Sequence, residues 1–207
     1  MNAPTGVARV RVTVSSGVGD MDTVDVGPPT WVVTARPYVA RNEEQYARGI
    51  SVALTDVRRP SAATLDPAIK SGNSAASLRA RRIARRAGAD EGILLSGEGW
   101  LAEGAVSNLF WIHEGALETP ALSLGVLPGI TRAKVCALAA QGAAGLAAVR
   151  EVASSPQRIE QATEVFVTNS LWEVLGVARW NGRSVQGGET GSITVALRKA
   201  LRGMYPG

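Results

Sequence analysis

Cysteine and histidine are nearly absent from this 207-residue sequence, which contains only Cys136 and His113. One cysteine cannot form an internal disulfide, so we expect a protein of the reducing cytoplasm. One histidine and one cysteine also cannot form a metal-ligand cluster, so no metal site is expected. No apolar run approaches the roughly 20 residues of a membrane span, and residues 1–20 lack the pattern of a signal peptide. The sequence therefore predicts neither a membrane segment nor a secretory leader.

Lysine is also scarce, because Lys70, Lys134 and Lys199 are the only ones, and arginine supplies most of the basic charge behind the net value of +4. The densest basic stretch, 79–86, contains no aromatic side chain on which a base could stack. We interpret it as the solvated face of a helix rather than as an RNA or DNA contact. No nucleic-acid partner is expected.

The apolar pattern predicts strands and helices in mixed order, which favours the α+β class. Hydrophobic residues make up 45% of the chain, enough for a sizeable core. No glycine motif with dinucleotide-binding spacing lies between a strand and a helix. The predicted strands are 8–14, 31–35, 49–57, 91–95, 100–102, 109–113, 149–152, 164–168, 177–180 and 184–185, and the predicted helices are 75–86, a segment from about 130 to 142, and 192–204.

Lys70 differs from the other two lysines, which lie within predicted helices. It follows a predicted loop at 61–68 and precedes Ser71, Gly72 and Asn73, small residues that let a ligand approach closely. The alternative is an ordinary solvated lysine. An amine that forms an imine must lose its proton, so its site must lower a pKa of about 10.4 through desolvation or a nearby positive charge.

Three further segments carry polar groups that suit one ligand. Glu103 lies among small residues between two predicted strands, where it is either an exposed turn carboxylate or the partner of a protonated ring nitrogen. Segment 127–132 (Leu-Pro-Gly-Ile-Thr-Arg) leads into a helix whose free N–H groups can bind phosphate, although Thr131 can also be a plain N-cap. Segment 166–170 (Phe-Val-Thr-Asn-Ser) ends a strand in hydroxyl and amide groups. Together with Lys70 these segments supply an imine-forming amine, a ring-nitrogen carboxylate and two phosphate cradles, the set of groups needed to hold pyridoxal phosphate.

In their order along the chain, these segments resemble the class IV aminotransferase family of pyridoxal-phosphate enzymes. The resemblance covers roughly residues 8–205 and is strongest at 69–73, 98–111, 127–132 and 166–174. It implies the mixed α+β fold of D-amino-acid aminotransferases (fold type IV) and pyridoxal 5'-phosphate as the cofactor. It implies that Lys70 bonds the cofactor and shuttles protons, and that Glu103 is the partner of its pyridine nitrogen. The remaining cofactor-binding residues that it implies are Asn108, Ile130, Thr131, Asn169 and Ser170.

Two branches of the family fit different parts of the sequence. Segments 98–100, 108–111 and 168–171 resemble the aminodeoxychorismate lyases, and Ser74 stands where aminotransferases usually carry a tyrosine. We therefore expect a lyase that converts 4-amino-4-deoxychorismate to 4-aminobenzoate and pyruvate in folate synthesis. Segments 70–73 and 127–132 look more like aminotransferases, so an enzyme acting on branched-chain or D-amino acids is the alternative. An inactive, truncated family member is the second alternative.

The front of the chain departs from the family pattern. Family members have an N-terminal lobe that begins well before the strand predicted at 8–14, and no residue here can be assigned its phosphate-binding arginine. We expect residues 1–40 to be a remnant of that small lobe and residues 41–207 to be the large cofactor-binding domain. A homodimer is expected by analogy with the family.

Overall fold

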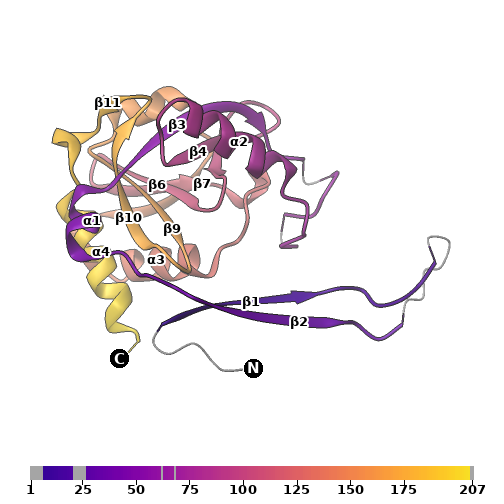
Figure 1. The fold of residues 1–207 in the computed structure, drawn as a ribbon. Coiled ribbons are helices and arrows are strands. Elements are labelled where there is room, and N and C mark those ends of the chain that lie inside the picture. Colours follow the sequence, from indigo (N-terminus) through magenta and orange to yellow (C-terminus); the bar gives the residue numbers. More distant parts are fainter. Residues whose placement is uncertain (1–6, 21–26, 62, 68, 206–207) are drawn as a thin grey trace. The chain divides into compact units, whose positions relative to one another are not determined.

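The computed structural model describes residues 7–20, 27–61, 63–67 and 69–205. The chain divides into two compact units, Met1–Arg41 and Asn42–Gly207. Figure 1 follows both units along the sequence. No helix within the described ranges is long and apolar enough to cross a membrane.

The first unit is an antiparallel ribbon of β1 (Ala8–Val14) and β2 (Trp31–Pro37). The register pairs Val12 with Val33 and Val14 with Trp31. Because side chains alternate along a strand, these residues share one face, and the arginines of both strands lie on the other. All four apolar side chains are exposed. The alternation in the sequence therefore predicted the strands correctly, but the apolar face lacks a covering layer.

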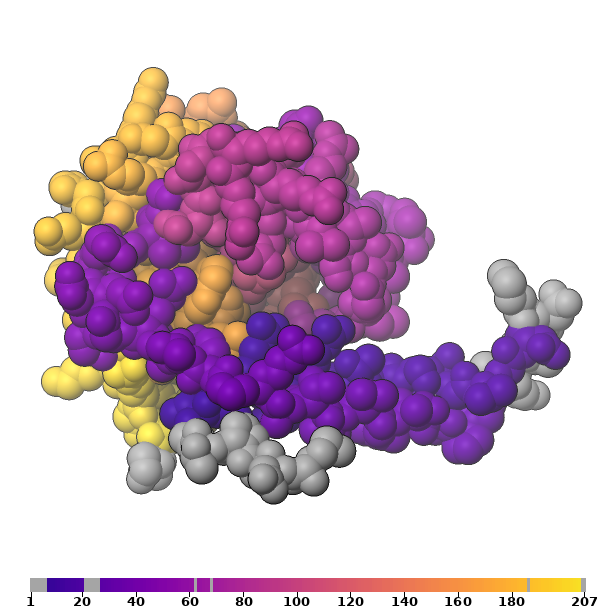
Figure 2. Space-filling view, in the orientation of Figure 1, coloured from indigo at the N-terminus to yellow at the C-terminus, as the bar shows by residue number. Residues whose placement is uncertain are grey.

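The second unit is built on a nine-stranded sheet in the described part of the chain. The pairings β3–β4, β4–β5, β5–β6, β6–β9, β9–β10 and β10–β3 close into a ring, and β7–β8 and β11 extend it. The space-filling view shows this unit as a packed body that ends in the yellow C-terminal helix (Figure 2). Its strands are β3 (Ile50–Arg58), β4 (Glu91–Leu95), β5 (Leu101–Gly104), β6 (Asn108–His113), β7 (Ala116–Pro120), β8 (Ala148–Val152), β9 (Glu164–Asn169), β10 (Glu173–Trp180) and β11 (Arg183–Ser184).

Four α-helices accompany the sheet in the described residues: α1 (Glu43–Arg48), α2 (Ala75–Arg86), α3 (Ile130–Ala140) and α4 (Ser192–Gly203). Helix α2 packs on β3 and β4, whereas α3 and α4 pack on each other and on β8 to β10. Short 3-10 turns lie at Leu122–Leu124, Ala143–Gly145, Pro156–Gln161 and Gln186–Gly188. The helices therefore cover the sheet from two sides (Figure 1).

Strands β6 and β9 are buried on both faces, and their alternation separates two cores. Leu109 and Trp111 belong to the cluster enclosed by the ring of strands, whereas Phe110 belongs to the cluster beneath α3 and α4. Phe110 stacks on Phe166 of β9, with ring centroids 5.0 Å apart and planes 8° apart. Burial of such aromatic side chains contributes about 1.5–3 kcal/mol each. The sheet that carries the candidate site residues is thus rigidly supported.

Each predicted strand and helix is present in the described residues, several with shifted bounds such as β10, which begins at Glu173 instead of 177, and one helix and one strand were not predicted. Helix 75–86 is confirmed residue for residue, and Asn181-Gly182 forms the predicted hairpin turn with φ of 49° and 79°. The strand predicted at 100–102 instead spans Leu101–Gly104. Helix α1 and strand β7 were not predicted, because α1 has only six residues and β7, buried throughout, shows no alternation.

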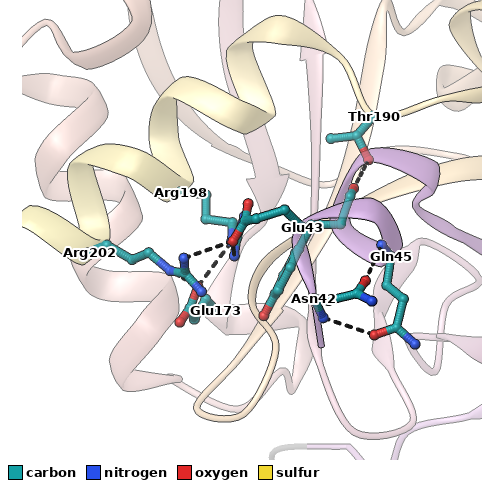
Figure 3. A network of polar contacts seen from close by, with 8 residues as sticks. Asn42, Glu43, Gln45, Glu173, Thr190, Arg198 and Arg202 are labelled. Carbon is teal, nitrogen blue, oxygen red and sulfur yellow. Dashed lines mark hydrogen bonds and ion pairs between the residues drawn. The ribbon is translucent and has the colours of Figure 1, made fainter. Parts of the chain in front are cut away.

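Helix α1 is held by contacts that the sequence does not reveal. The Arg198 guanidinium of α4 forms ion pairs with Glu43 of α1 at 2.7 Å and with Glu173 at 3.0 Å. Arg202 forms ion pairs with the same two carboxylates (Figure 3). The Arg198 guanidinium carbon also lies 3.3 Å from the centroid of the Tyr46 ring. These hydrogen bonds hold the pKa of the Glu43 carboxyl at about 2, well below its ordinary value. The network ties α1, β10 and α4 together.

Candidate functional site

Glu103 is a buried carboxylate at the end of β5, with 6% of its surface exposed. Its Oε1 lies 3.0 Å from the Arg59 Nε, and its Oε2 accepts the Leu127 N–H at 3.0 Å. Desolvation raises the pKa of Glu103 above its ordinary value, and the Arg59 guanidinium is the largest influence opposing that rise. The structure therefore contradicts the interpretation of Glu103 as an exposed turn residue.

Asn108 links Glu103 to the segment that precedes α3. Its Nδ2 donates to the Leu127 carbonyl at 2.8 Å and contacts Glu103 Oε2 at 3.4 Å. Gly129 comes so close that a Cβ there would lie 2.1 Å from Asn108 Oδ1. Since real Cβ atoms do not approach that closely, Gly129 is required for this packing. The start of α3 is thus fixed against Asn108 and Glu103.

Helix α3 begins without a side-chain cap. Its N-cap residue is Gly129, so Thr131 is not the N-cap that the sequence left open as an alternative. The first N–H groups of an α-helix have no partner within the helix, and the helix dipole favours an anion beside them. Ile130 is exposed and Thr131 is half-buried. This end of α3 can therefore offer N–H groups and one hydroxyl to an anionic ligand.

A pocket of about 540 Å³ lies at the start of α3. That volume suits a small-molecule ligand. Four of the predicted cofactor-binding residues meet there, two from α3 and two from the turn after β9. The pocket is lined by Ile130, Thr131, Asn169, Ser170, Glu173, Leu201, Arg202 and Tyr205.

The turn after β9 is held by Asn169. Its Oδ1 accepts the N–H groups of Leu171 and Trp172 at 2.9 and 2.8 Å, and its Nδ2 donates to the Val106 carbonyl at 3.1 Å. Both ends of the Asn169 amide are therefore engaged by the backbone. Ser170 is exposed beside it, so its hydroxyl is the better-placed of the two groups for a ligand.

Lys70 lies in the loop between β3 and α2 and is exposed, so the structure does not show desolvation, one of the two causes that the sequence analysis gave for a lowered lysine pKa. It does not line the pocket beside α3. Its ammonium group is nevertheless close enough to Glu103 to lower the pKa of that carboxyl, which places Lys70 in electrostatic reach of the site. The role of Lys70 stays a prediction.

Two further polar groups lie near the site, and Arg59 was not found from the sequence. Arg59 carries no signal of spacing or composition that separates it from its neighbour Arg58, and only the folded chain brings it to Glu103. Thr168 is fully buried opposite Asn108 in the β6–β9 register, and its hydroxyl has no hydrogen-bond partner among the described residues. The sequence analysis named Thr168 within segment 166–170 as a hydroxyl at a strand end, but did not assign it to the cofactor.

The fold places the uncapped start of α3 and the buried, ion-paired Glu103 on either side of Leu127. The sequence model described as amino-transferase class IV matches residues 2–180. The chain belongs to the class IV aminotransferase family. The family resemblance and the mixed α+β fold class predicted from the sequence are thereby confirmed.

Curated and solved relatives agree with this assignment. The branched-chain-amino-acid aminotransferase of Escherichia coli K12 is 34% identical over 197 residues, which cover 92% of this chain and 62% of the relative. A crystal structure of an Escherichia coli branched-chain amino acid aminotransferase matches 96% of this chain and 66% of its own, with 32% identity and a TM-score of 0.86. The PLP-form of the Thermobaculum terrenum enzyme matches 95% and 64%, with 28% identity and a TM-score of 0.84. The chain thus spans less than two thirds of these relatives.

Proposed function

We propose that this chain takes part in pyridoxal-phosphate-dependent transamination, with branched-chain amino acids and their 2-oxo acids as the substrate class. The names of the matched relatives support this alternative better than the lyase that we expected first from the sequence. One solved relative carries the cofactor in its PLP-form. The observation that carries the proposal is the meeting of Ile130, Thr131 and Ser170 around one pocket, with the buried Glu103 bound to Leu127, three residues before α3.

The described residues fit the cofactor at its phosphate end. The uncapped N–H groups at Ile130 and Thr131 and the hydroxyls of Thr131 and Ser170 are a donor set for a phosphate group. The pocket of about 540 Å³ has room for a ligand of this size. When bound, pyridoxal phosphate supplies an electron sink for the α-carbon of an amino acid.

Side chains of this chain would bond the cofactor, act as the base at the substrate and supply a negative charge to the ring nitrogen. The Lys70 amine would bond the cofactor aldehyde and, once released, move a proton at the substrate α-carbon. The Glu103 carboxylate would accept a hydrogen bond from the protonated ring nitrogen, and the Arg59 guanidinium at 3.0 Å opposes protonation of that carboxylate. Asn108 would keep Glu103 and the α3 segment in register.

The proposal extends to the organisation of the whole protein. Residues 1–40 would belong to a small lobe and residues 41–207 to the large cofactor-binding domain, which agrees with the two compact units of the chain. The protein would be cytoplasmic. A homodimer would cover exposed surface of the kind seen on β1 and β2.

The first experiment tests cofactor bonding. Purified protein is titrated with pyridoxal phosphate, its visible absorbance is recorded, and borohydride reduction is followed by mass spectrometry of peptides. We expect a new visible band and a reduced adduct on Lys70, and Lys70→Ala should lose both. Lys199→Ala, a change at an exposed lysine on α4, is the matched control. An adduct distributed over all three lysines would contradict a dedicated site.

The second experiment separates transfer from elimination. The cofactor-loaded protein is incubated with leucine, isoleucine or valine and 2-oxoglutarate, and separately with 4-amino-4-deoxychorismate. Glutamate formed from 2-oxoglutarate supports the aminotransferase. Release of 4-aminobenzoate and pyruvate without glutamate formation would replace it by the lyase.

A further inference from the structure

Arg59 connects three parts of the candidate site. It directly follows β3, and its backbone N–H donates to the Leu95 carbonyl at 2.8 Å. Its Nε lies 3.0 Å from Glu103 Oε1 and 3.1 Å from the Gly125 carbonyl. Eleven residues further along the chain, Lys70 lies in the same loop, which continues to the start of α2. Arg59 therefore fixes both the carboxylate and the start of the Lys70 loop.

The charge of Arg59 matters because Glu103 is almost fully desolvated. The side chains of Arg59 and Glu103 are 19% and 8% exposed, so water screens their attraction only weakly. The charged groups that act on Glu103 are Arg59, Lys70 and Arg132, and Arg59 has the largest effect. Lys70 is exposed, and Arg132 is already paired with Glu151 at 3.1 Å. Arg59 is thus the main cation that opposes protonation of Glu103.

We propose that Arg59 is a positioning residue that keeps Glu103 ionised and aimed at the ring nitrogen before the cofactor binds. This inference rests on the proposed function, because it assigns Glu103 to the cofactor ring. A protonated Glu103 carries no negative charge to attract a protonated ring nitrogen. Without Arg59, cofactor binding would have to supply the free energy for ionising a buried carboxyl.

A purely structural role predicts different behaviour. If Arg59 served only to hold Gly125, its loss would lower stability without changing the protonation of Glu103. Arg59→Met removes the charge and the hydrogen bonds, whereas Arg59→Lys keeps the charge and loses the planar guanidinium. Arg58→Met is the matched control, since Arg58 donates to the Ser96 carbonyl and is not among the charged groups that act most strongly on Glu103.

The first measurement uses the protein without cofactor. Glutamate carboxyl carbons are labelled, the Glu103 signal is assigned with Glu103→Gln, and its titration is followed by NMR. We expect the carboxyl of Arg59→Met to titrate at higher pH than wild type, and Arg59→Lys and Arg58→Met to titrate near wild type. An Arg59→Met titration that coincides with wild type would overturn the proposal.

The second measurement follows the dissociation constant of pyridoxal phosphate from pH 5 to 9. The ratio of the dissociation constant of Arg59→Met to that of wild type should fall about tenfold for each unit by which the pH rises. The fall should end once Glu103 of the variant is ionised. Arg59→Lys should restore the wild-type profile, which a merely structural role would not require. If the dissociation constants of Arg59→Met and wild type change with pH in the same way, the inference is rejected. If wild type does not bind pyridoxal phosphate at all, the proposed function is rejected. The NMR titration decides the Arg59–Glu103 interaction in both cases.

Discussion

Glu91 offers a test of the core that needs no ligand. It begins β4 with none of its surface exposed, and its Oε1 accepts the N–H groups of Gly92 and Ala105 at 3.0 and 2.9 Å. Its Oε2 has no hydrogen-bond partner among the described residues. Burial raises the pKa of Glu91 to about 7. We expect Glu91→Gln to preserve the packing and to remove the cost of ionisation.

The size of the effect follows from the pKa. A value of about 7 stands against an ordinary value of 4.5, and each unit corresponds to about 1.36 kcal/mol, which gives about 3 kcal/mol in total. Because the folded state has the higher pKa, the contribution of Glu91 to stability is complete below pH 4.5 and is lost as the pH rises through 7. The stability of Glu91→Gln relative to wild type should therefore increase by about 3 kcal/mol between pH 4 and pH 8.

Urea unfolding at several pH values, followed by tryptophan fluorescence, measures this difference. Trp111 is fully buried, so unfolding changes its surroundings strongly. Glu160→Gln, at an exposed side chain, controls for the loss of one carboxylate. A stability difference that stays constant from pH 4 to pH 8 would refute the buried, uncompensated state of Glu91.

Three further predictions address other parts of the second unit. Glu43→Gln should destabilise the protein most above pH 4.5, because the pairing with Arg198 holds the pKa of Glu43 at about 2. This loss of stability should vanish as the pH falls toward 2, and acid unfolding curves of the variant and wild type measure it. Gly129→Ala should cost about 1–3 kcal/mol in urea unfolding and weaken cofactor binding, whereas Gly97→Ala, with open space around it, should change neither. Phe166→Ala should cost about 3–5 kcal/mol in urea unfolding, since the ring is fully buried; a cost below 1 kcal/mol would contradict the stacked core.

Local patterns predicted most of the secondary structure because the relevant forces are local. The hairpin at Asn181-Gly182 needs two residues with positive φ, and the amphipathic helix 75–86 needs only its 3.6-residue period. Helix α1 depends on the ion pairs of Glu43 with α4, more than 150 residues away. Such a partner leaves no trace in the sequence of the helix itself. The capping box of Asn42 and Gln45 is a local signal for its start, but six residues are too few to show a helical period.

The same distinction applies to the candidate site. The four segments were found because each combines small or polar residues at a strand or helix end, and their order is specific. Neither the ion pair of Arg59 with Glu103 nor the bond from Asn108 to Leu127 could be predicted, because both join residues that are far apart in the sequence. The exposure of Lys70 also depends on the folded chain, and its predicted enclosure is not seen.

The backbone N–H and carbonyl of Leu127 contact residues at both ends of the proposed cofactor site. The Leu127 N–H binds Glu103 while the Leu127 carbonyl accepts from Asn108, so the carboxylate for the ring nitrogen and the approach to α3 share the same two hydrogen bonds. Helix α3 starts three residues later, and its free N–H groups would meet the phosphate. Because a helix transmits displacement of its first turn rigidly, a shift of Leu127 moves both ends together. The separation between Leu127, which the Glu103 carboxylate contacts, and the first N–H groups of α3 is therefore set by the backbone of residues 127–130, which would suit a ligand as rigid as a phosphorylated pyridine.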